Sequence, residues 1–117
     1  MYGLPKDFDP HTLVEHRLDQ LCFGQYQLAL HFDGDVSITV ESHMEYQPSK
    51  GETPQSINFP IITSSVMQLL GHAIVNAFGD KEGTLTLEFD NAHVLRCFDQ
   101  PRYEAYQVRI GTKEIIV

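Results

Sequence analysis

Hydrophobic and polar residues alternate with a period of two along much of the chain, most regularly between Tyr26 and Tyr46. Apolar side chains occupy the even positions on both sides of the segment 33–35. A three-residue loop at this segment pairs Phe32 with Val36, whereas a two-residue loop would place apolar residues opposite polar ones. The pattern therefore predicts a half-buried antiparallel hairpin, in which the pairs are Phe32 with Val36, Leu30 with Ile38, and Leu28 with Val40.

A second segment of the same kind follows later in the chain. Residues 28–40 read LALHFDGDVSITV and residues 85–97 read LTLEFDNAHVLRC. A loop at 90–92 would place Phe89 opposite His93 in a second hairpin. The outward face of its last strand carries Val94, Arg96 and Phe98, so both faces are partly apolar. We expect this face to contact a helix or a second subunit, because an open sheet face seldom lines up large apolar side chains.

Two short helices are expected between the strands. Asp9 and Pro10 suit the N-cap and first position of a helix over 11–16. Thr63 can cap a second helix, which would end before Gly71 and would lay an apolar stripe on one face of the sheet. Residues 18–23 and 72–78 read as strands, and the Pro- and Gly-containing segment 47–58 reads as a loop.

The end of the chain predicts another hairpin. Gly111 and Thr112 form a Gly-X pair suited to a tight turn, which pairs Val108 with Ile115. Continuing this alternation backwards places Glu104 on the buried side of its strand. A buried carboxylate is unfavourable unless it is paired or protonated, and the expected partners are Arg96, Arg17 or the Tyr26 hydroxyl.

These elements together predict one domain of the α+β class with mostly antiparallel strands. It would contain two similar hairpin-rich halves at about 18–46 and 72–99, a linker at 47–58, one short helix between the halves and a C-terminal hairpin at 103–117. Each half is too small to bury its own apolar face, so the halves are expected to share one core.

Charge narrows the classes of partner. The chain has 16 acidic and 8 basic residues, a formal net charge of −8. This charge disfavours nucleic acid and favours a basic protein. No apolar run is long enough for a membrane span, and no secretory signal pattern is present, so we expect no membrane association and a cytoplasmic location.

Motifs for catalysis, metals and cofactors are missing from the sequence. Cys22 and Cys97 belong to no metal or redox spacing and are expected to be buried, reduced thiols. The six histidines do not have the spacing of a zinc site. No nucleophile elbow and no glycine-rich phosphate loop occurs, so no catalytic residue, metal or cofactor is assigned.

The stretches QLCFGQYQLALHF, GTLTLEFDN and YEAYQVRIG followed by IIV resemble a family of small bacterial domains of unknown function. The YExYQ stretch at 103–107 is the most specific of them. Some similar small domains act as immunity proteins beside bacterial toxins. The resemblance therefore implies a binding role and carries over no catalytic residues.

Glu104 is the best single candidate for a binding residue, with Tyr103, Tyr106 and Gln107 lining a cleft around it. Its alternative role is structural, holding strand ends together. The leading functional hypothesis is a non-catalytic protein-binding domain. The alternatives are a small-molecule binder or enzyme with a cleft around Glu104, and a homodimeric structural protein.

Overall fold

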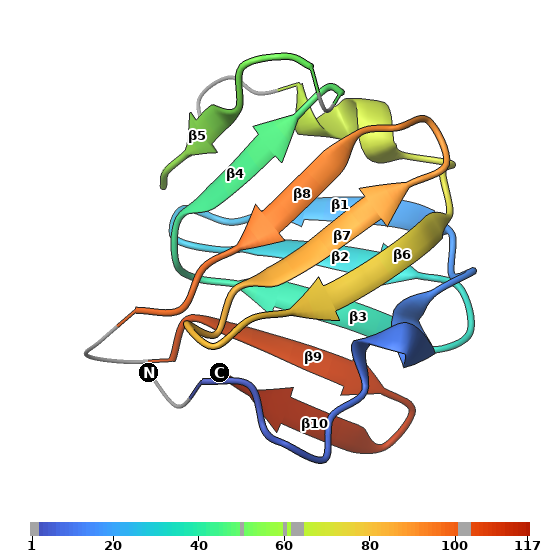
Figure 1. Cartoon of the computed structure of the whole chain (residues 1–117), viewed down its shortest axis with the longest axis vertical. Helices are drawn as coiled ribbons and strands as arrows, with labels where there is room; N and C mark the ends of the chain where they lie inside the picture. Colours follow the sequence, from blue (N-terminus) through green and yellow to red (C-terminus); the bar gives the residue numbers. More distant parts are fainter. Residues whose placement is uncertain (1–2, 50, 60, 62–64, 101–103) are drawn as a thin grey trace.

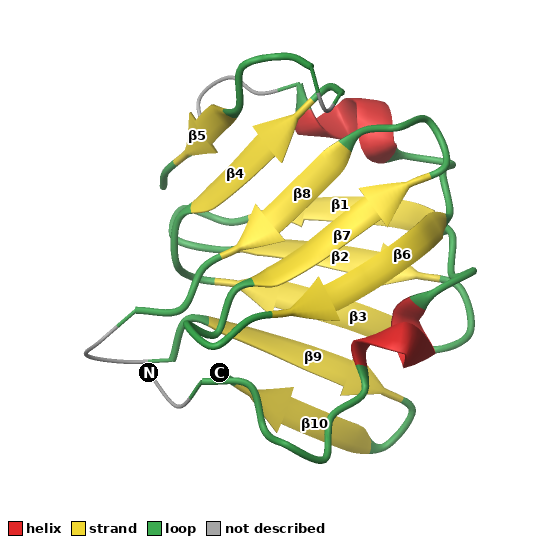
Figure 2. Cartoon of the chain, in the orientation of Figure 1, coloured by secondary structure: helices red, strands yellow, loops and turns green. Residues whose placement is uncertain are grey.

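The computed structural model describes residues 3–49, 51–59, 61, 65–100 and 104–117, and these form two layers of antiparallel β-strands (Figure 2). The first sheet has the strand order β1-β2-β3-β9-β10 and the second the order β5-β4-β8-β7-β6. The strands are β1 Leu18–Phe23, β2 Leu28–Phe32, β3 Val36–Val40, β4 Met44–Gln47, β5 Gln55–Ile57, β6 Ile74–Gly79, β7 Leu85–Phe89, β8 Val94–Cys97, β9 Tyr106–Ile110 and β10 Lys113–Ile116.

One hydrophobic core lies between the two sheets. The alternating strands turn their apolar side chains inward from both layers, as the period of two requires. The largest fully buried side chains come from both sheets and from both turns before them: Leu13, Leu18, Leu28, Leu30, Ile38, Met44, Tyr46, Leu69, Ile74, Leu85, Phe89 and Tyr106.

The α+β prediction is wrong, because the described residues contain no α-helix. Only two single 3-10 turns are present, η1 at Pro10–Leu13 and η2 at Val66–Leu69. The expected cap Thr63 lies outside the described residues, and Ser65, which precedes η2, makes no capping hydrogen bond through its side chain. So short a segment cannot offset the unfavourable nucleation of a helix, and η2 contributes buried Val66 and Leu69 to the core. Within the described ranges, no helix has the length and hydropathy needed to cross a membrane.

The register of the first hairpin is confirmed in all three predicted pairs, from Leu28–Val40 to Phe32–Val36. The expectation for Tyr26 is wrong, since this side chain is 67% exposed. The reason is a tight turn before the strand, closed by the Gly24 N–H donating to the Gln27 carbonyl at 2.8 Å. The inward alternation therefore begins at Leu28.

The other two hairpins also have their predicted registers. Leu85 pairs with Cys97 and Leu87 with Leu95, and the Phe89 N–H donates to the His93 carbonyl at 2.9 Å. In the C-terminal hairpin Val108 pairs with Ile115.

The segment 47–58 is not a simple loop, because β5 lies within it and pairs with β4. The apolar alternation that runs from Val36 to Tyr46 is also divided between two sheets. β3 belongs to the first sheet and β4 to the second, and the chain crosses between them at 41–43. Ser42 fixes this crossing, since its hydroxyl donates to the Phe98 carbonyl at 2.6 Å.

The chain is an internal repeat whose halves exchange strands. A 3-10 turn followed by five strands occurs once, from η1 to β5, and again from η2 to β10. Each sheet contains the first three strands of one half and the last two strands of the other half. Figure 1 shows the exchange by colour: red β9 lies beside β3 with β10 beyond it, and green β4 lies beside orange β8 with β5 beyond it.

The two halves meet in a symmetrical junction around Arg17 and Ala73, which pair as an isolated antiparallel bridge. Every backbone hydrogen bond here has its counterpart in the other half. In one equivalent pair, the Leu18 N–H donates to the His72 carbonyl at 3.0 Å, and the Ile74 N–H donates to the His16 carbonyl at 2.9 Å. In the other pair, the Gly71 N–H donates to the Leu18 carbonyl at 2.8 Å, and the Glu15 N–H donates to the Ile74 carbonyl at 2.7 Å.

An aspartate in each hairpin loop contacts the histidine of its own half. Nδ1 of His16 lies 3.1 Å from Asp33 Oδ1, and Nδ1 of His72 lies 2.6 Å from Asp90 Oδ1. The repeated LxLxFD phrase therefore reflects two equivalent structural units. Its aspartates anchor the hairpin loops to the junction.

Candidate functional site

The four residues predicted to line a binding site do not share one accessible cleft. Tyr103 lies outside the described residues. Tyr106 is 1% exposed, and its hydroxyl donates to the Gly83 carbonyl at 2.6 Å. Burial raises the pKa of the Tyr106 hydroxyl, so this group stays protonated as a donor. Tyr106 is a core residue whose ring is not available to a ligand.

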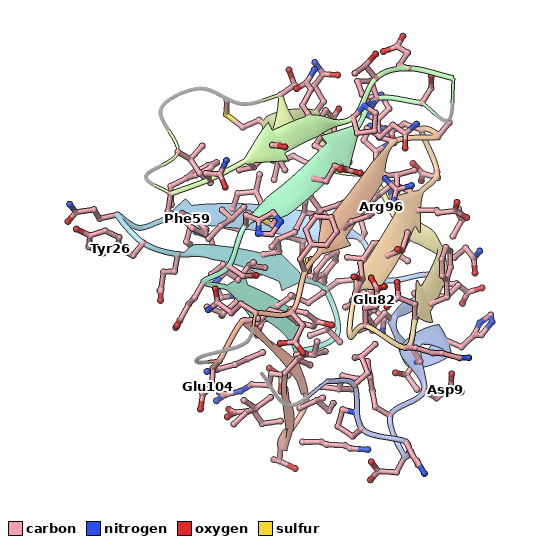
Figure 3. All side chains as sticks on the ribbon, turned by 60° about the vertical axis from the view of Figure 1, so that its left-hand side comes forward. Asp9, Tyr26, Phe59, Glu82, Arg96 and Glu104 are labelled. Carbon is pink, nitrogen blue, oxygen red and sulfur yellow. The ribbon has the colours of Figure 1, made fainter. Side chains whose placement is uncertain are left out.

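Glu104 is half-buried and hydrogen-bonds to the fourth predicted residue. Its Oε2 accepts a hydrogen bond from Gln107 Nε2 at 3.1 Å. The predicted partners lie elsewhere, as Figure 3 shows for Arg96 and Tyr26. The binding role of Glu104 and Gln107 stays a prediction.

Glu104 is partly buried and hydrogen-bonded as expected. It does not share the fully buried side of the strand with Tyr106, because the alternation breaks before β9. Ala105 and Tyr106 are both buried although they are consecutive. The Ala105 carbonyl accepts from two successive N–H groups, those of Glu41 and Ser42, at 2.8 and 3.0 Å. Two residues opposite one is the arrangement of a β-bulge, and its extra residue lies here in the crossing 41–43, opposite Ala105.

A polar groove follows the outer face of the first sheet beside these residues. Two adjoining depressions of about 210 and 240 Å³ share His31, Ser37 and Arg109. We define the polar groove by the lining of the larger depression: His31, Ser37, Thr39, Gln107, Arg109 and Glu114.

The groove exists because short side chains lie between long ones. Ser37 and Thr39 project from the central strand β3 and form its floor. His31 on β2 pairs with Ser37 on one side, and Arg109 on β9 pairs with Ser37 on the other. Arg109 is fixed by Glu114 of β10, its Nη2 donating to Oε2 at 2.9 Å.

The groove retains unused hydrogen-bonding capacity. Within the described chain, the side chains of His31, Ser37 and Thr39 have no hydrogen-bond partner. The hydroxyls can each donate one hydrogen bond and accept two, and a neutral imidazole can donate one and accept one. This surface therefore presents one exposed and two half-buried polar groups that suit a polar ligand.

On the second sheet, the position equivalent to Thr39 is filled by a long side chain. Arg96 occupies the position that Thr39 has in the first half, opposite Glu45 of β4. Its Nη1 donates to Glu45 Oε1 and to Gln47 Oε1, both at 3.1 Å. This position is thus open in the first sheet and filled in the second.

The outward face of β8 is covered differently from the sequence-based expectation of a helix or second subunit. The Phe98 ring stacks on the His43 imidazole, with ring centres 4.6 Å apart. Arg96 lies against β4, as described above. The face is therefore partly covered by side chains of the neighbouring strand and of the crossing 41–43.

The two thiols are free but differ in environment. Cys97 is buried as predicted, and burial raises its pKa to about 12. Cys22 is exposed, contrary to the prediction, because β1 is an edge strand and this residue lies on its outer side.

The histidines serve structural contacts in several places. His93 contacts the Tyr46 hydroxyl through Nδ1, and His16 and His72 contact the loop aspartates. Across the described ranges, no three His, Cys, Asp or Glu side chains gather in a group that could hold a metal ion.

Sequence reasoning missed most of the polar groove. The pairing of His31 with Ser37 follows from the predicted hairpin, but the approach of β9 to β3 does not, since these strands come from different halves. The only signal in the sequence was the polar outer side of the first hairpin.

The comparison with protein families identifies the chain. A model of DUF6188, a family of unknown function, matches residues 10–117. The chain belongs to this family. The DUF6188 match begins at Pro10, the first residue of η1, so it includes both halves of the repeat. The predicted resemblance to a family of unknown function is confirmed, while bacterial origin and immunity-like activity stay predictions. No curated protein and no solved structure matched the chain.

Proposed function

We propose that this DUF6188 domain is a non-catalytic binding domain whose polar groove receives a polar segment of another protein. The observation that carries the proposal is the contrast between the two halves. Among the residues that the structure describes, the side chains of His31, Ser37 and Thr39 have no hydrogen-bond partner, whereas Arg96 bonds to Glu45 and Gln47 on the second sheet.

The dimensions of the groove favour a protein segment over an enclosed small molecule. Its depressions of about 210 and 240 Å³ are smaller than the roughly 300–1,000 Å³ of typical small-molecule sites. A peptide segment lying across a sheet face needs only shallow contacts and exposed hydrogen-bonding groups.

The net charge of −8 favours a basic partner, because a field of one sign speeds the approach of the opposite charge. An immunity-type inhibitor that binds a basic toxin in the cytoplasm would have this charge. The family resemblance supports the same role.

The test places an arginine in the polar groove, because an arginine fills the equivalent position of the second sheet. In Thr39→Arg, an arginine would lie opposite Gln107 as Arg96 lies opposite Glu45. Thr112→Arg makes the same chemical change at an exposed turn of the same sheet. Immobilised wild-type protein and both variants are incubated with extract of the source cells, and retained proteins are identified by mass spectrometry.

We expect one or more proteins to be retained by the wild-type chain and by Thr112→Arg, and lost from Thr39→Arg. Circular dichroism would check that both variants fold. Equal retention by both variants would show that the groove is not the binding surface.

A further inference from the structure

An exposed turn with two aromatic side chains joins β1 to β2 at one edge of the first sheet. We define this aromatic turn as residues 23–27, which read FGQYQ. All five residues are exposed, and the exposed fractions of Phe23 and Tyr26 are 46% and 67%. Single exposed apolar residues are common on protein surfaces, whereas neighbouring aromatic rings are typical of contact surfaces.

Backbone pairing holds the aromatic turn in place. Phe23 pairs with Leu28 in the antiparallel register of β1 and β2. One residue further on, the Gly24 N–H donates to the Gln27 carbonyl at 2.8 Å and closes the turn. Figure 3 shows Tyr26 at the outer end of this turn, away from the two sheets. A turn that is already formed loses little conformational freedom when a partner contacts it.

The second half of the repeat forms its equivalent turn without aromatic residues. Gly79 corresponds to Phe23, because each residue pairs with the first residue of the next strand. The Leu4 side chain packs against Gly79, with its Cδ1 atom 2.1 Å from the place that a Cβ atom would occupy. The turn after Gly79 reads DKEG. The framework of the repeat therefore does not require the two rings of the first half.

Glu41 adds a negative charge beside the aromatic turn. Leu28 pairs with Val40, so Gln27 and Glu41 lie next to each other at the same end of β2 and β3. The Glu41 N–H donates to the Ala105 carbonyl at 2.8 Å, which fixes the backbone at this point. Glu41 is exposed, and within the described ranges its carboxylate has no hydrogen bond or ion pair.

Aromatic rings beside a carboxylate favour a cation as the ligand. A ring attracts a cation over its face, and the planar guanidinium of arginine stacks on aromatic rings more readily than the ammonium of lysine does. The net charge of −8 attracts a basic protein and opposes association with a second, equally acidic copy of the chain. Charge complementarity therefore selects a basic protein as the partner.

We propose that the aromatic turn binds an arginine-containing segment of a basic protein. One guanidinium stacks on Tyr26, a second basic side chain pairs with Glu41, and the Phe23 ring contacts the apolar part of the segment. All three side chains are exposed, so the fold does not have to rearrange. None of them belongs to the polar groove, so this surface stands independently of the function proposed for the groove.

The test is a titration of the ¹⁵N-labelled full chain followed by NMR. The probe is N-acetyl-arginyl-glycyl-argininamide. In one control peptide both arginines are replaced by citrulline, which keeps the shape and removes the charge. In the other both are replaced by lysine, which keeps the charge and removes the planar guanidinium. We expect the probe to shift the amide signals of residues 23–27 and 41, and both control peptides to bind at least twofold more weakly.

Variants of the protein separate the ring from the charge. Tyr26→Ser should weaken the probe about two- to fivefold, the range of an exposed cation–π contact, whereas Tyr26→Phe keeps the ring and should bind like wild type. Glu41→Gln should weaken the probe by a similar factor, as expected for an exposed ion pair. The matched controls are Phe78→Ser and Glu82→Gln, which remove an exposed ring and an exposed charge from the β6–β7 hairpin and should have no effect.

Each of three results would overturn the proposal. The first is the absence of localised shifts at the aromatic turn. The second is equal binding of the probe and either control peptide, or an unchanged affinity in Tyr26→Ser or Glu41→Gln. The third is a concentration-dependent shift of the same signals without peptide, which would assign the turn to contacts with a second copy of the chain. Binding at the turn is read from its own signals, so failure here leaves the polar groove test unaffected.

Discussion

Thr39 and Arg96 occupy equivalent positions in the two halves of the chain, each on the outer face of the strand that follows its hairpin loop. Thr39 pairs with Gln107 across β3 and β9, and Arg96 pairs with Glu45 across β8 and β4. One half uses the position to leave a groove open, and the other uses it to join two strands.

Arg96→Thr should open the second groove and weaken the second sheet. The Arg96 side chain is 30% exposed and bonds to Glu45 and Gln47. Allowing for solvent screening, we expect the free energy of unfolding to fall by about 1 kcal/mol. Urea denaturation of wild-type and variant chains measures this difference. An unchanged midpoint would mean that the arginine contributes no net stability.

Glu15 and Gly71 are an equivalent pair in which one member is strained. Both have positive φ angles, 77° and 82°, at the junction of the halves. Glycine adopts this conformation readily, whereas a residue with a Cβ atom does so at a cost of about 1 kcal/mol. Glu15→Gly should therefore raise the free energy of unfolding by about 0.5–1 kcal/mol, and Gly71→Ala should lower it by a similar amount. Thermal denaturation of the two variants would show opposite shifts, and shifts of the same sign would contradict the assignment.

The two cysteines should differ in reactivity toward a thiol reagent. Cys22 is exposed, while Cys97 is buried with its pKa raised to about 12. The reactive species is the thiolate, so native protein at pH 8 should consume one equivalent of Ellman's reagent quickly and the second only after unfolding. Cys22→Ser is the control, which should abolish the fast reaction.

Alkaline pH should destabilise the fold. Burial raises the pKa of Cys97 from 9.0 to about 12 and raises the pKa of Tyr106 above its usual 10.0. Above about pH 9 the unfolded chain loses these protons before the folded chain does, so the unfolded state is favoured as the pH rises. We expect the urea midpoint to be constant from pH 7 to 8.5 and to fall progressively above pH 9. Cys97→Ala should delay the onset of this fall, and the same onset in this variant would argue against the thiol.

Glu104 should contribute little to stability, because its carboxylate is half-buried and accepts a hydrogen bond from the neutral amide of Gln107. Glu104→Ala should lower the free energy of unfolding by less than about 1 kcal/mol, and Glu104→Gln by less still. Chemical denaturation compares both variants with wild type. A loss of about 3 kcal/mol in Glu104→Ala would instead indicate the fully buried carboxylate that strand alternation predicts.

The sequence predicts the local pairings of this fold better than its architecture. Side-chain alternation and loop length determine which face of a hairpin is buried, so three hairpin registers could be predicted. The alternation cannot show that the chain crosses between sheets after Val40, because Met44 and Tyr46 keep the same parity in their new sheet. Nor does it show that the consecutive residues Ala105 and Tyr106 are both buried, which leaves Glu104 only partly buried.

The candidate sites depend on those non-local features. Ser37 and Thr39 become the floor of a groove only when β9, from the other half, lies beside β3. This relationship joins residues that are far apart in the chain, so it leaves no periodic signal in the sequence.

The exchange of strands between the halves also determines when the protein can fold. β3, in the middle of the first sheet, has β9 and β10 on its far side, and these strands are made after the other strands of both sheets. Strands β1 to β3 can pair during synthesis, but their sheet keeps an unpaired edge at β3 until residues 106–116 emerge. The emergence of β9 and β10 is therefore the step that closes the core. A chain truncated before β9 would expose that edge to other chains and would tend to pair with a second copy of itself.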